Sequence, residues 1–383
     1  MAQQSRRNFL HAAAATIAFP MVNMGSYRVF AQSSATYSAR AIELVNASLV
    51  IDMLSVLPPL GPMFLAAFGK EPKRVDGGLI DEGHLHKLLS MGIDVFHPAI
   101  GVGTREEAFM VMARNNAYAS EHPGVLVRVD SVEDFERVRA KDKLGFILGL
   151  QSAGHFAELD DIDLFYNLGQ RVCQLTYNSR NLIGTGATDR SDGGLSDFGV
   201  RVVERMNEVG MAIDVSHCGD RTTLDAFEFS KKPVLITHSN CRALVPGHPR
   251  CKTDEAILAV KKSGGVMGIT GVRNFIRDKE PTTIEHMLDH YDHVARLIGV
   301  EHLGVGSDMD PDGYDDIPEP AYSALKGGYK NSYSFRDKID TDGFDHPKRM
   351  YDLTEGLIRR GYSNADIEGI LGGNFKRALA AIW

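Results

Sequence analysis

The sequence predicts an α/β fold, a TIM-type (β/α)8 barrel. Eight short apolar runs recur along the chain, and most are followed by a loop and then by an amphipathic stretch. Most of these runs lack apolar–polar alternation, which is typical of parallel strands buried on both faces. The runs cover residues 46–52, 92–100, 144–150, 171–177, 210–216, 233–237, 264–270 and 302–308.

Helical patterns separate the predicted strands. A helix over 196–209 begins after Ser196, a preferred N-cap residue, and ends at Gly210. The stretch 309–345 is rich in Asp, Gly, Pro and Tyr and predicts a long loop. Further helices are predicted over 104–121, 284–299, 346–361 and 364–382, the last with Trp383 packing at its end.

The composition excludes several classes of protein. Of the 383 residues, 43% are hydrophobic and 24% charged, which is ordinary for a globular chain and unlike a disordered or collagen-like one. The formal charge is -8, and an acidic chain does not suit nucleic acid or an anionic membrane surface. No apolar run approaches the about 18 residues that a membrane-spanning helix needs.

The N-terminus has the pattern of an export signal. Arg6 and Arg7 precede an alanine-rich apolar stretch, and small or apolar residues at 29–31 suit a signal peptidase. We therefore expect a twin-arginine signal over 1–31, a single barrel domain over 36–383, and a periplasmic protein exported already folded. The alternative is an arginine pair that happens to precede a short amphipathic helix.

Four cysteines occur in one region of the chain, and none has the spacing of a metal finger. They are Cys173, Cys218, Cys241 and Cys251. Buried free thiols are the preferred interpretation. A bridge between Cys241 and Cys251 is the alternative, because an oxidising compartment permits disulfides.

Polar side chains stand at the predicted carboxyl ends of the strands, where barrel active sites lie. In chain order these residues are Asp52, His97, Gln151, Tyr177, His217, His238, Thr270 and Asp308.

Two of these residues, His217 and His238, end neighbouring strands. Equivalent ends of adjacent strands are about 5 Å apart, so the two imidazoles can share one divalent ion. Asp308 ends the eighth strand, where it can orient a water molecule or accept its proton. Arg250 lies in the loop after the sixth strand and suits a substrate carboxylate. The alternatives are hydrogen-bonded histidines at the rim and a capping or surface arginine.

Several motifs, in order, resemble the membrane (renal-type) dipeptidase family. The resemblance spans about 40–383 and is strongest from residue 171 onward. Its motifs are LTYNSRN, GLSDFG, DVSHCGDRT, KKPVLITHSNCRAL, HPRCKTD, GGVMGI, LDHYDHV, GVGSDMD and ILGGNFKR.

The resemblance implies a barrel hydrolase that holds two zinc ions and cleaves dipeptides or related amides. It implies that His217 and His238 bind one zinc, that Asp308 lies beside the water and that Arg250 binds the carboxylate. It implies a dipeptide or other small molecule as the partner, and a homodimer as the assembly to test.

The chain departs from the family pattern at the other zinc site. The family's first strand ends in Asp-x-His-x-Asp, but here Asp52 is followed by Leu54 and Val56. Gln151 stands in place of a bridging Glu, and a neutral amide is a poor bridge between two cations. Tyr177, expected at the substrate, stands where a His is often found.

Other side chains could replace the missing ligands. His97 is the leading candidate, because it lies at the end of a predicted strand. The other candidates are Asp94, His84, His86 and His155, and Cys251 stands where an Asn usually follows the arginine.

The function that we expect is hydrolysis of a dipeptide or related small amide with one firmly bound Zn²⁺. Three protein ligands and an open position suffice for catalytic zinc. The alternative is a non-catalytic descendant that binds a small peptide or acid and has lost the second metal site. A two-zinc dipeptidase would require replacement ligands.

Overall fold

The computed structural model describes residues 26–27, 36–56, 87–141 and 143–383. The predicted export signal lies outside the described residues apart from Ser26 and Tyr27, and so do His84 and His86. No helix within the described ranges is long and apolar enough to cross a membrane.

The main sheet is parallel throughout. Among the described residues it contains ten strands in the order β5-β6-β4-β3-β12-β11-β10-β9-β8-β7, and neighbouring strands pair in parallel. A separate antiparallel pair joins β1 (Ser26–Tyr27) and β2 (Tyr37–Ser38). The main-sheet strands are β3 (Ile51–Ser55), β4 (Val95–Pro98), β5 (Leu126–Arg128), β6 (Leu144–Phe146), β7 (Gly149–Leu150), β8 (Val172–Gln174), β9 (Ala212–Asp214), β10 (Val234–Ser239), β11 (Met267–Ile269) and β12 (Leu303–Val305).

The sheet closes into a ring through residues 144–150. The first half of this stretch, β6, pairs with β4, and the second half, β7, pairs with β8. Between the halves, the backbone N–H of Ile147 donates to Phe96 O at 2.8 Å, and that of Arg171 donates to Leu148 O at 2.8 Å. The predicted TIM-type barrel is therefore confirmed.

The eight predicted strands all form, with two differences. The prediction 46–52 begins too early, because Ser38 caps a helix whose last residue is Ala47, and β3 continues to Ser55. Asp52 thus lies inside β3 and not at its end. The prediction omitted β5, a three-residue strand that is too short to produce a recognisable pattern.

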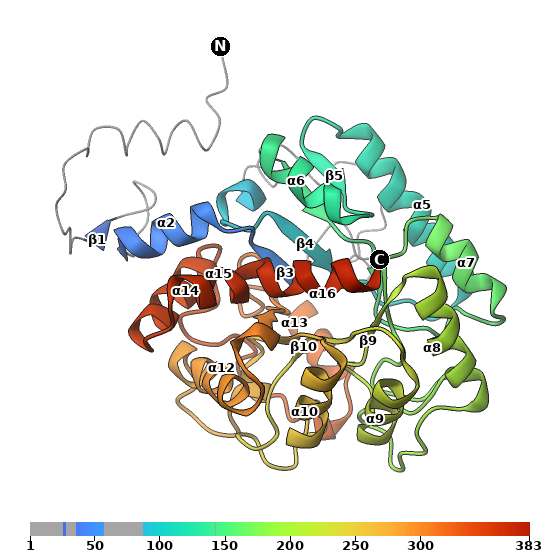
Figure 1. Ribbon diagram of the computed structural model, residues 1–383. Coiled ribbons are helices and arrows are strands. Elements are labelled where there is room, and N and C mark those ends of the chain that lie inside the picture. The colour runs from blue at the N-terminus through green and yellow to red at the C-terminus, as the bar shows by residue number, and fades with distance from the viewer. Residues whose placement is uncertain (1–25, 28–35, 57–86, 142) are drawn as a thin grey trace.

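Helices surround the ring, and their caps follow from the sequence (Figure 1). The predicted N-cap and C-terminal residue of α8 are confirmed: Ser196 Oγ accepts from Gly199 N at 2.9 Å, and Gly210 has a left-handed φ of 85°. The helices are α2 (Ala39–Ala47), α5 (Arg105–Glu121), α6 (Val132–Lys141), α7 (Asp160–Asn167), α8 (Asp197–Val209), α9 (Asp220–Phe229), α10 (Asp254–Ser263), α11 (Arg273–Ile276), α12 (Ile284–Ile298), η1 (Val300–His302), α13 (Ala321–Gly327), η2 (Asn331–Tyr333), α14 (Arg349–Arg359), α15 (Asn364–Glu368), η3 (Gly369–Gly373) and α16 (Asn374–Ile382).

The predicted helix over 364–382 is interrupted at Gly372. A Cβ on this residue would lie 2.1 Å from Leu49 O, so the close approach of the chain before β3 requires a glycine there. Beyond the break, α16 carries Phe375 and Leu379 into a cluster with residues of the strands. Trp383 follows and stacks on Phe135 with ring centroids 5.9 Å apart.

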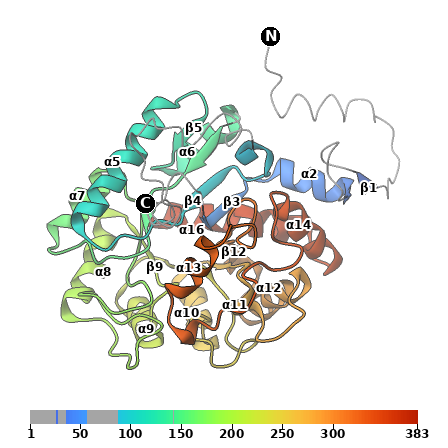
Figure 2. The same cartoon turned by 180° about the vertical axis from the view of Figure 1, so that it is seen from behind.

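Side chains from around the ring fill the barrel interior. One buried cluster takes residues from six strands and from the segment between β6 and β7, and α16 crosses the near end of the barrel (Figure 1). The opposite face carries α11 and α13, which Figure 2 shows in front of the barrel. The strand residues of this cluster are Ile51, Met53, Val95, Val127, Val172, Ala212 and Leu235, and Ile147 joins it from between β6 and β7.

The preferred interpretation of the cysteines is confirmed, since all four are buried free thiols. The alternative bridge does not form. Cys241 Sγ donates to His290 O, and Cys251 Sγ donates to Phe275 O.

We predict that Gly149→Ala destabilises the fold. A Cβ at this position would lie 2.1 Å from His97 Nε2 and 3.0 Å from Val172 Cβ, and His97 is held on its other side by Met53 O at 2.7 Å. Overpacking of this kind lowers the free energy of unfolding by about 1–3 kcal/mol, measurable by urea denaturation. Gly124→Ala is the control, because nothing lies within 4 Å of its added Cβ. Equal losses in the two variants would refute the steric argument.

Candidate metal and substrate site

The barrel brings His217 and His238 together. His238 lies in β10, His217 follows the adjacent strand β9, and the two strands pair through Leu235 and Asp214. Both imidazoles are buried, and their Nε2 atoms are 2.9 Å apart. The predicted meeting of the two rings is therefore correct, and binding of a metal by them stays a prediction.

Hydrogen bonds determine which nitrogen of each ring carries the proton. His217 Nδ1 lies 2.8 Å from Asn178 Oδ1, an acceptor, so Nδ1 must donate. His238 Nδ1 lies 2.8 Å from Thr237 Oγ1, which gives its own proton to Asp214 Oδ2 at 2.8 Å. His238 Nδ1 must therefore donate as well, and both Nε2 atoms present lone pairs.

Two lone pairs at 2.9 Å repel one another unless a cation lies between them. A proton is disfavoured there. Burial, followed by the charge of Arg250, lowers the pKa of both His217 and His238 well below the usual value. The pair has the donor chemistry for a divalent metal, with orienting partners behind each ring.

Asp308 is the acidic residue of the site. It follows β12, and its backbone has a left-handed φ of 55° that is unusual for a residue other than glycine. Its N–H donates to Leu54 O at 2.8 Å, and its carbonyl accepts from Tyr314 Oη at 2.9 Å. Burial raises the pKa of the Asp308 carboxyl to about 7, with Arg250 opposing that rise. Such a group can exchange a proton near neutral pH.

Tyr177 covers one face of His217. The two rings stack with centroids 4.2 Å apart and an interplanar angle of 21°. The Tyr177 hydroxyl lies 3.0 Å from that of Tyr329, a residue of the long 309–345 segment. Together with His217 and Asp308, both tyrosines line a pocket of about 380 Å³, including its open mouth.

Arg250 lies beneath the site and is fully buried. Its terminal nitrogens donate to the carbonyls of Ser216 and His238, and its Nε has no partner. The guanidinium lies 5.1 Å from the ring centroid of Phe275. Arg250 does not line the pocket, so its role with a substrate carboxylate stays a prediction.

Asp52 and His97, two of the additional candidates, do not join the histidine pair. The described residues contain no group of three or more His, Cys, Asp or Glu side chains that could hold one ion. Asp52 accepts from Ser307 N at 2.7 Å and Ser307 Oγ at 2.5 Å, and lies 3.7 Å from Arg349. Leu54 and Val56 are buried and apolar.

His97 and Gln151 are buried inside the barrel. His97 donates through Nδ1 to Met53 O, which leaves its Nε2 lone pair buried without a partner. Gln151 accepts through its backbone carbonyl from Gln174 at 2.6 Å. His155 contacts Ser152 O and Gln170 Oε1 through its two ring nitrogens.

Sequence reasoning missed the residues that orient the imidazoles. Asn178 directly follows Tyr177, and Thr237 directly precedes His238, so proximity along the chain was an available signal. The sequence contains no comparable signal for Asp214, a buried carboxylate at the end of β9. Its role becomes clear from its four hydrogen-bond donors, which are Ser216 N, Ser216 Oγ, Thr237 N and Thr237 Oγ1.

A closed parallel barrel with two facing imidazoles and an acid at its carboxyl-terminal mouth has the architecture of a metal-dependent barrel hydrolase. Residues 104–322 match the family described as membrane dipeptidase (peptidase family M19). This match covers more than half of the chain, and the protein belongs to that family.

Individual relatives agree with this assignment. The chain is 33% identical to dipeptidase verJ of Clonostachys rogersoniana over 219 residues, which are 57% of this chain and 50% of that one. It spans about half the length of most of the curated dipeptidases that it matches.

Solved structures share the fold over nearly the whole chain. An amidohydrolase from Pseudomonas aeruginosa has a TM-score of 0.77 at 26% identity, covering 90% of this chain and 99% of its own. A metallo peptidase from Rhodobacter sphaeroides, liganded with a phosphinate mimic of the dipeptide L-Ala-D-Ala, has a TM-score of 0.67 at 19% identity. That likeness covers 88% of this chain and 100% of the other.

We predict that Asn178→Ala weakens zinc binding. Because the backbone φ of Asn178 is 59°, alanine there is strained, and circular dichroism checks that the variant is folded. The substitution removes the acceptor that holds His217 Nδ1, and loss of such an orienting partner typically lowers metal affinity about 10–100-fold. Competition titration with a chromophoric chelator measures the affinity. Asn364→Ala, at the exposed start of α15, is the control. An unchanged affinity in Asn178→Ala would contradict the proposed orientation.

Proposed function

We propose that this protein is a metal-dependent hydrolase that cleaves a dipeptide or a related small amide. The observation that carries the proposal is the pair of Nε2 lone pairs, 2.9 Å apart, beside a pocket that also contains Asp308. The names of the relatives support the substrate class, and the buried acid near the pair supports hydrolysis.

We propose one zinc ion and not two. His217 and His238 would hold it, with one more protein group and water or substrate completing its coordination. The described residues place no third His, Cys, Asp or Glu ligand beside them. A second ion would need carboxylates, since two nearby dications repel strongly in a buried site. Asp52 is already engaged by Ser307 and Arg349, and Gln151 has no charge.

The chain's own residues would act as follows. When bound, zinc polarises a carbonyl group and lowers the pKa of water toward 7. Asp308 would accept the proton of the attacking water and return it to the leaving amine. Tyr177 would keep His217 oriented by stacking on it. Arg250, which is fully buried and does not line the pocket, would contribute positive potential beneath the site.

The second candidate function is binding of a small peptide or acid without catalysis. It is favoured by the absence, among the described residues, of any His, Cys, Asp and Glu cluster able to hold an ion. The two candidates differ in metal content and in turnover, so one set of measurements distinguishes them.

We predict one zinc per chain in protein purified without chelator, and none in His217→Ala or His238→Ala. Each substitution removes one of two facing ligands. Elemental analysis counts the metal, and hydrolysis of alanyl dipeptides follows turnover. His122→Ala, near the end of α5 and away from the pair, is the control.

Two zinc ions per chain would refute the single-ion proposal. A folded protein with neither zinc nor turnover would favour the binding function.

We predict that the carboxyl of Asp308 titrates near pH 7 in zinc-free protein and at lower pH after zinc is added. Burial raises the pKa to about 7, whereas a nearby dication favours the ionised form and lowers the pKa again. The carboxyl ¹³C shift of labelled protein measures both midpoints, with Asp308→Asn used to assign the resonance. A midpoint that zinc does not move would separate Asp308 from the metal site.

A further inference from the structure

The long 309–345 segment covers the site with aromatic and apolar side chains. Six of its residues line the pocket above His217 and Asp308. They are Tyr314, Leu325, Tyr329, Tyr333, Phe335 and Ile339, which we call the lid residues.

The lid rings form one continuous cluster. Tyr329 lies with its ring centroid 4.5 Å from that of Tyr333, and Phe335 lies 5.3 Å from Tyr329 and 5.0 Å from Tyr333. Phe275, which also lines the pocket, extends the cluster with a centroid 5.2 Å from that of Tyr333. These separations are in the range where aromatic rings attract one another, so a further ring would find favourable contacts there.

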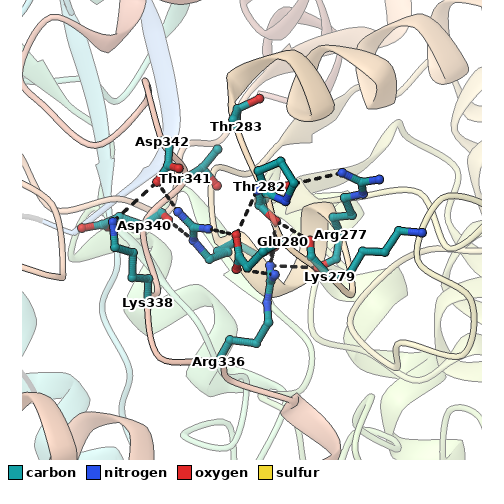
Figure 3. Close-up of polar contacts among 12 residues, drawn as sticks. Arg277, Lys279, Glu280, Thr282, Thr283, Arg336, Lys338, Asp340, Thr341 and Asp342 are labelled. Atoms are coloured by element: carbon teal, nitrogen blue, oxygen red, sulfur yellow. Dashed lines mark hydrogen bonds and ion pairs between the residues drawn. The ribbon is translucent and has the colours of Figure 1, made fainter.

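Polar contacts hold this cluster in place. The carbonyl of Tyr333 accepts from Asn274 Nδ2 at 2.5 Å and from His248 Nε2 at 3.1 Å. Next to Phe335, the guanidinium of Arg336 contacts Glu280 at 2.5 Å and Thr282 Oγ1 at 3.0 Å (Figure 3).

The same polar network continues into the protein. Buried Arg273 pairs with Glu280 and Asp342, and Lys338 lies 3.8 Å from Asp342. The lid residues are therefore preorganised, which lowers the entropy lost when a ligand binds.

Among the described residues, the lid end of the pocket contains no ionisable acid or base apart from the tyrosines. His217 and Asp308 lie at the barrel end, and within the described part of the chain no Lys, Arg or Glu lines the pocket. Burial raises the pKa of Tyr314, Tyr329 and Tyr333 above the usual value, so these phenols are neutral at pH 7. A charged group placed among these neutral rings would lose its hydration. The Arg250 guanidinium, 5.1 Å from the Phe275 ring centroid, already donates to two backbone carbonyls.

We infer that the lid end of the pocket binds an uncharged aromatic side chain of the substrate. The inference rests on the proposed function, because it places the scissile amide at the barrel end beside His217 and Asp308.

The test compares L-Ala-L-Phe with L-Ala-L-Glu and L-Ala-L-Lys on the zinc-loaded full chain. We expect kcat/KM to be about 100-fold higher for the aromatic dipeptide, because a charged side chain would lose its hydration among neutral aromatic rings. Similar values for all three would overturn the inference and leave the proposed function intact.

A binding measurement separates failure of the inference from failure of the proposed function. If no dipeptide is hydrolysed, calorimetric titration with L-phenylalanine and with L-glutamate still reports on the pocket. Tighter binding of phenylalanine would support the inference, and equal or undetectable binding of both would overturn it.

Two variants assign the preference to the lid. Phe335→Ala and Leu325→Ala should each lower kcat/KM for L-Ala-L-Phe about 10-fold more than kcat/KM for L-Ala-Gly. Phe229→Ala and Leu182→Ala are matched controls, since both residues are surface-exposed and neither lines the pocket. Equal losses on both substrates would indicate a purely structural effect and overturn the assignment.

Discussion

The site depends on two imidazole lone pairs that are held facing one another. Neither ring could keep this orientation alone, because the Nε2 atoms would otherwise turn apart to find donors. Asn178 accepts from one Nδ1, and Thr237, itself held by buried Asp214, accepts from the other. The barrel thus holds two mutually repelling Nε2 lone pairs at its mouth. A divalent cation bound between them would remove this repulsion.

The distribution of buried charge determines how much metal the site can support. Asp52 lies in the first barrel strand, and the positive charge of Arg349, 3.7 Å away, compensates its negative charge. Its carboxylate also accepts two hydrogen bonds from Ser307. Asp308 is the acid that remains in the pocket, where burial and Arg250 act on its pKa in opposite directions. A site with one free carboxylate and two neutral imidazoles is suited to one dication and lacks the negative charge that two would require.

The 309–345 segment then gives the site a second, chemically different end. Its rings are held by polar contacts on the outer side, including those of Arg336 and the Tyr333 carbonyl. The pocket is consequently polar where His217 and Asp308 lie and aromatic beneath the lid residues. In the proposed function, the catalytic groups lie at the strand ends and the selectivity lies on one long loop, an arrangement that is general for barrel enzymes.

By itself, the sequence determined the barrel and its two central histidines, because buried parallel strands leave continuous apolar runs and functional residues follow their carboxyl ends. The export signal remains a prediction from the sequence. Tertiary structure alone decided the roles of Asp52, Asn178 and the lid tyrosines. Their partners lie far away in sequence or in another strand, and hydrogen bonds between such residues produce no periodic pattern along the chain. The sequence likewise contains no sign of the ring closure through residues 144–150. This stretch is a single apolar run, but its first half pairs with β4 and its second half pairs with β8.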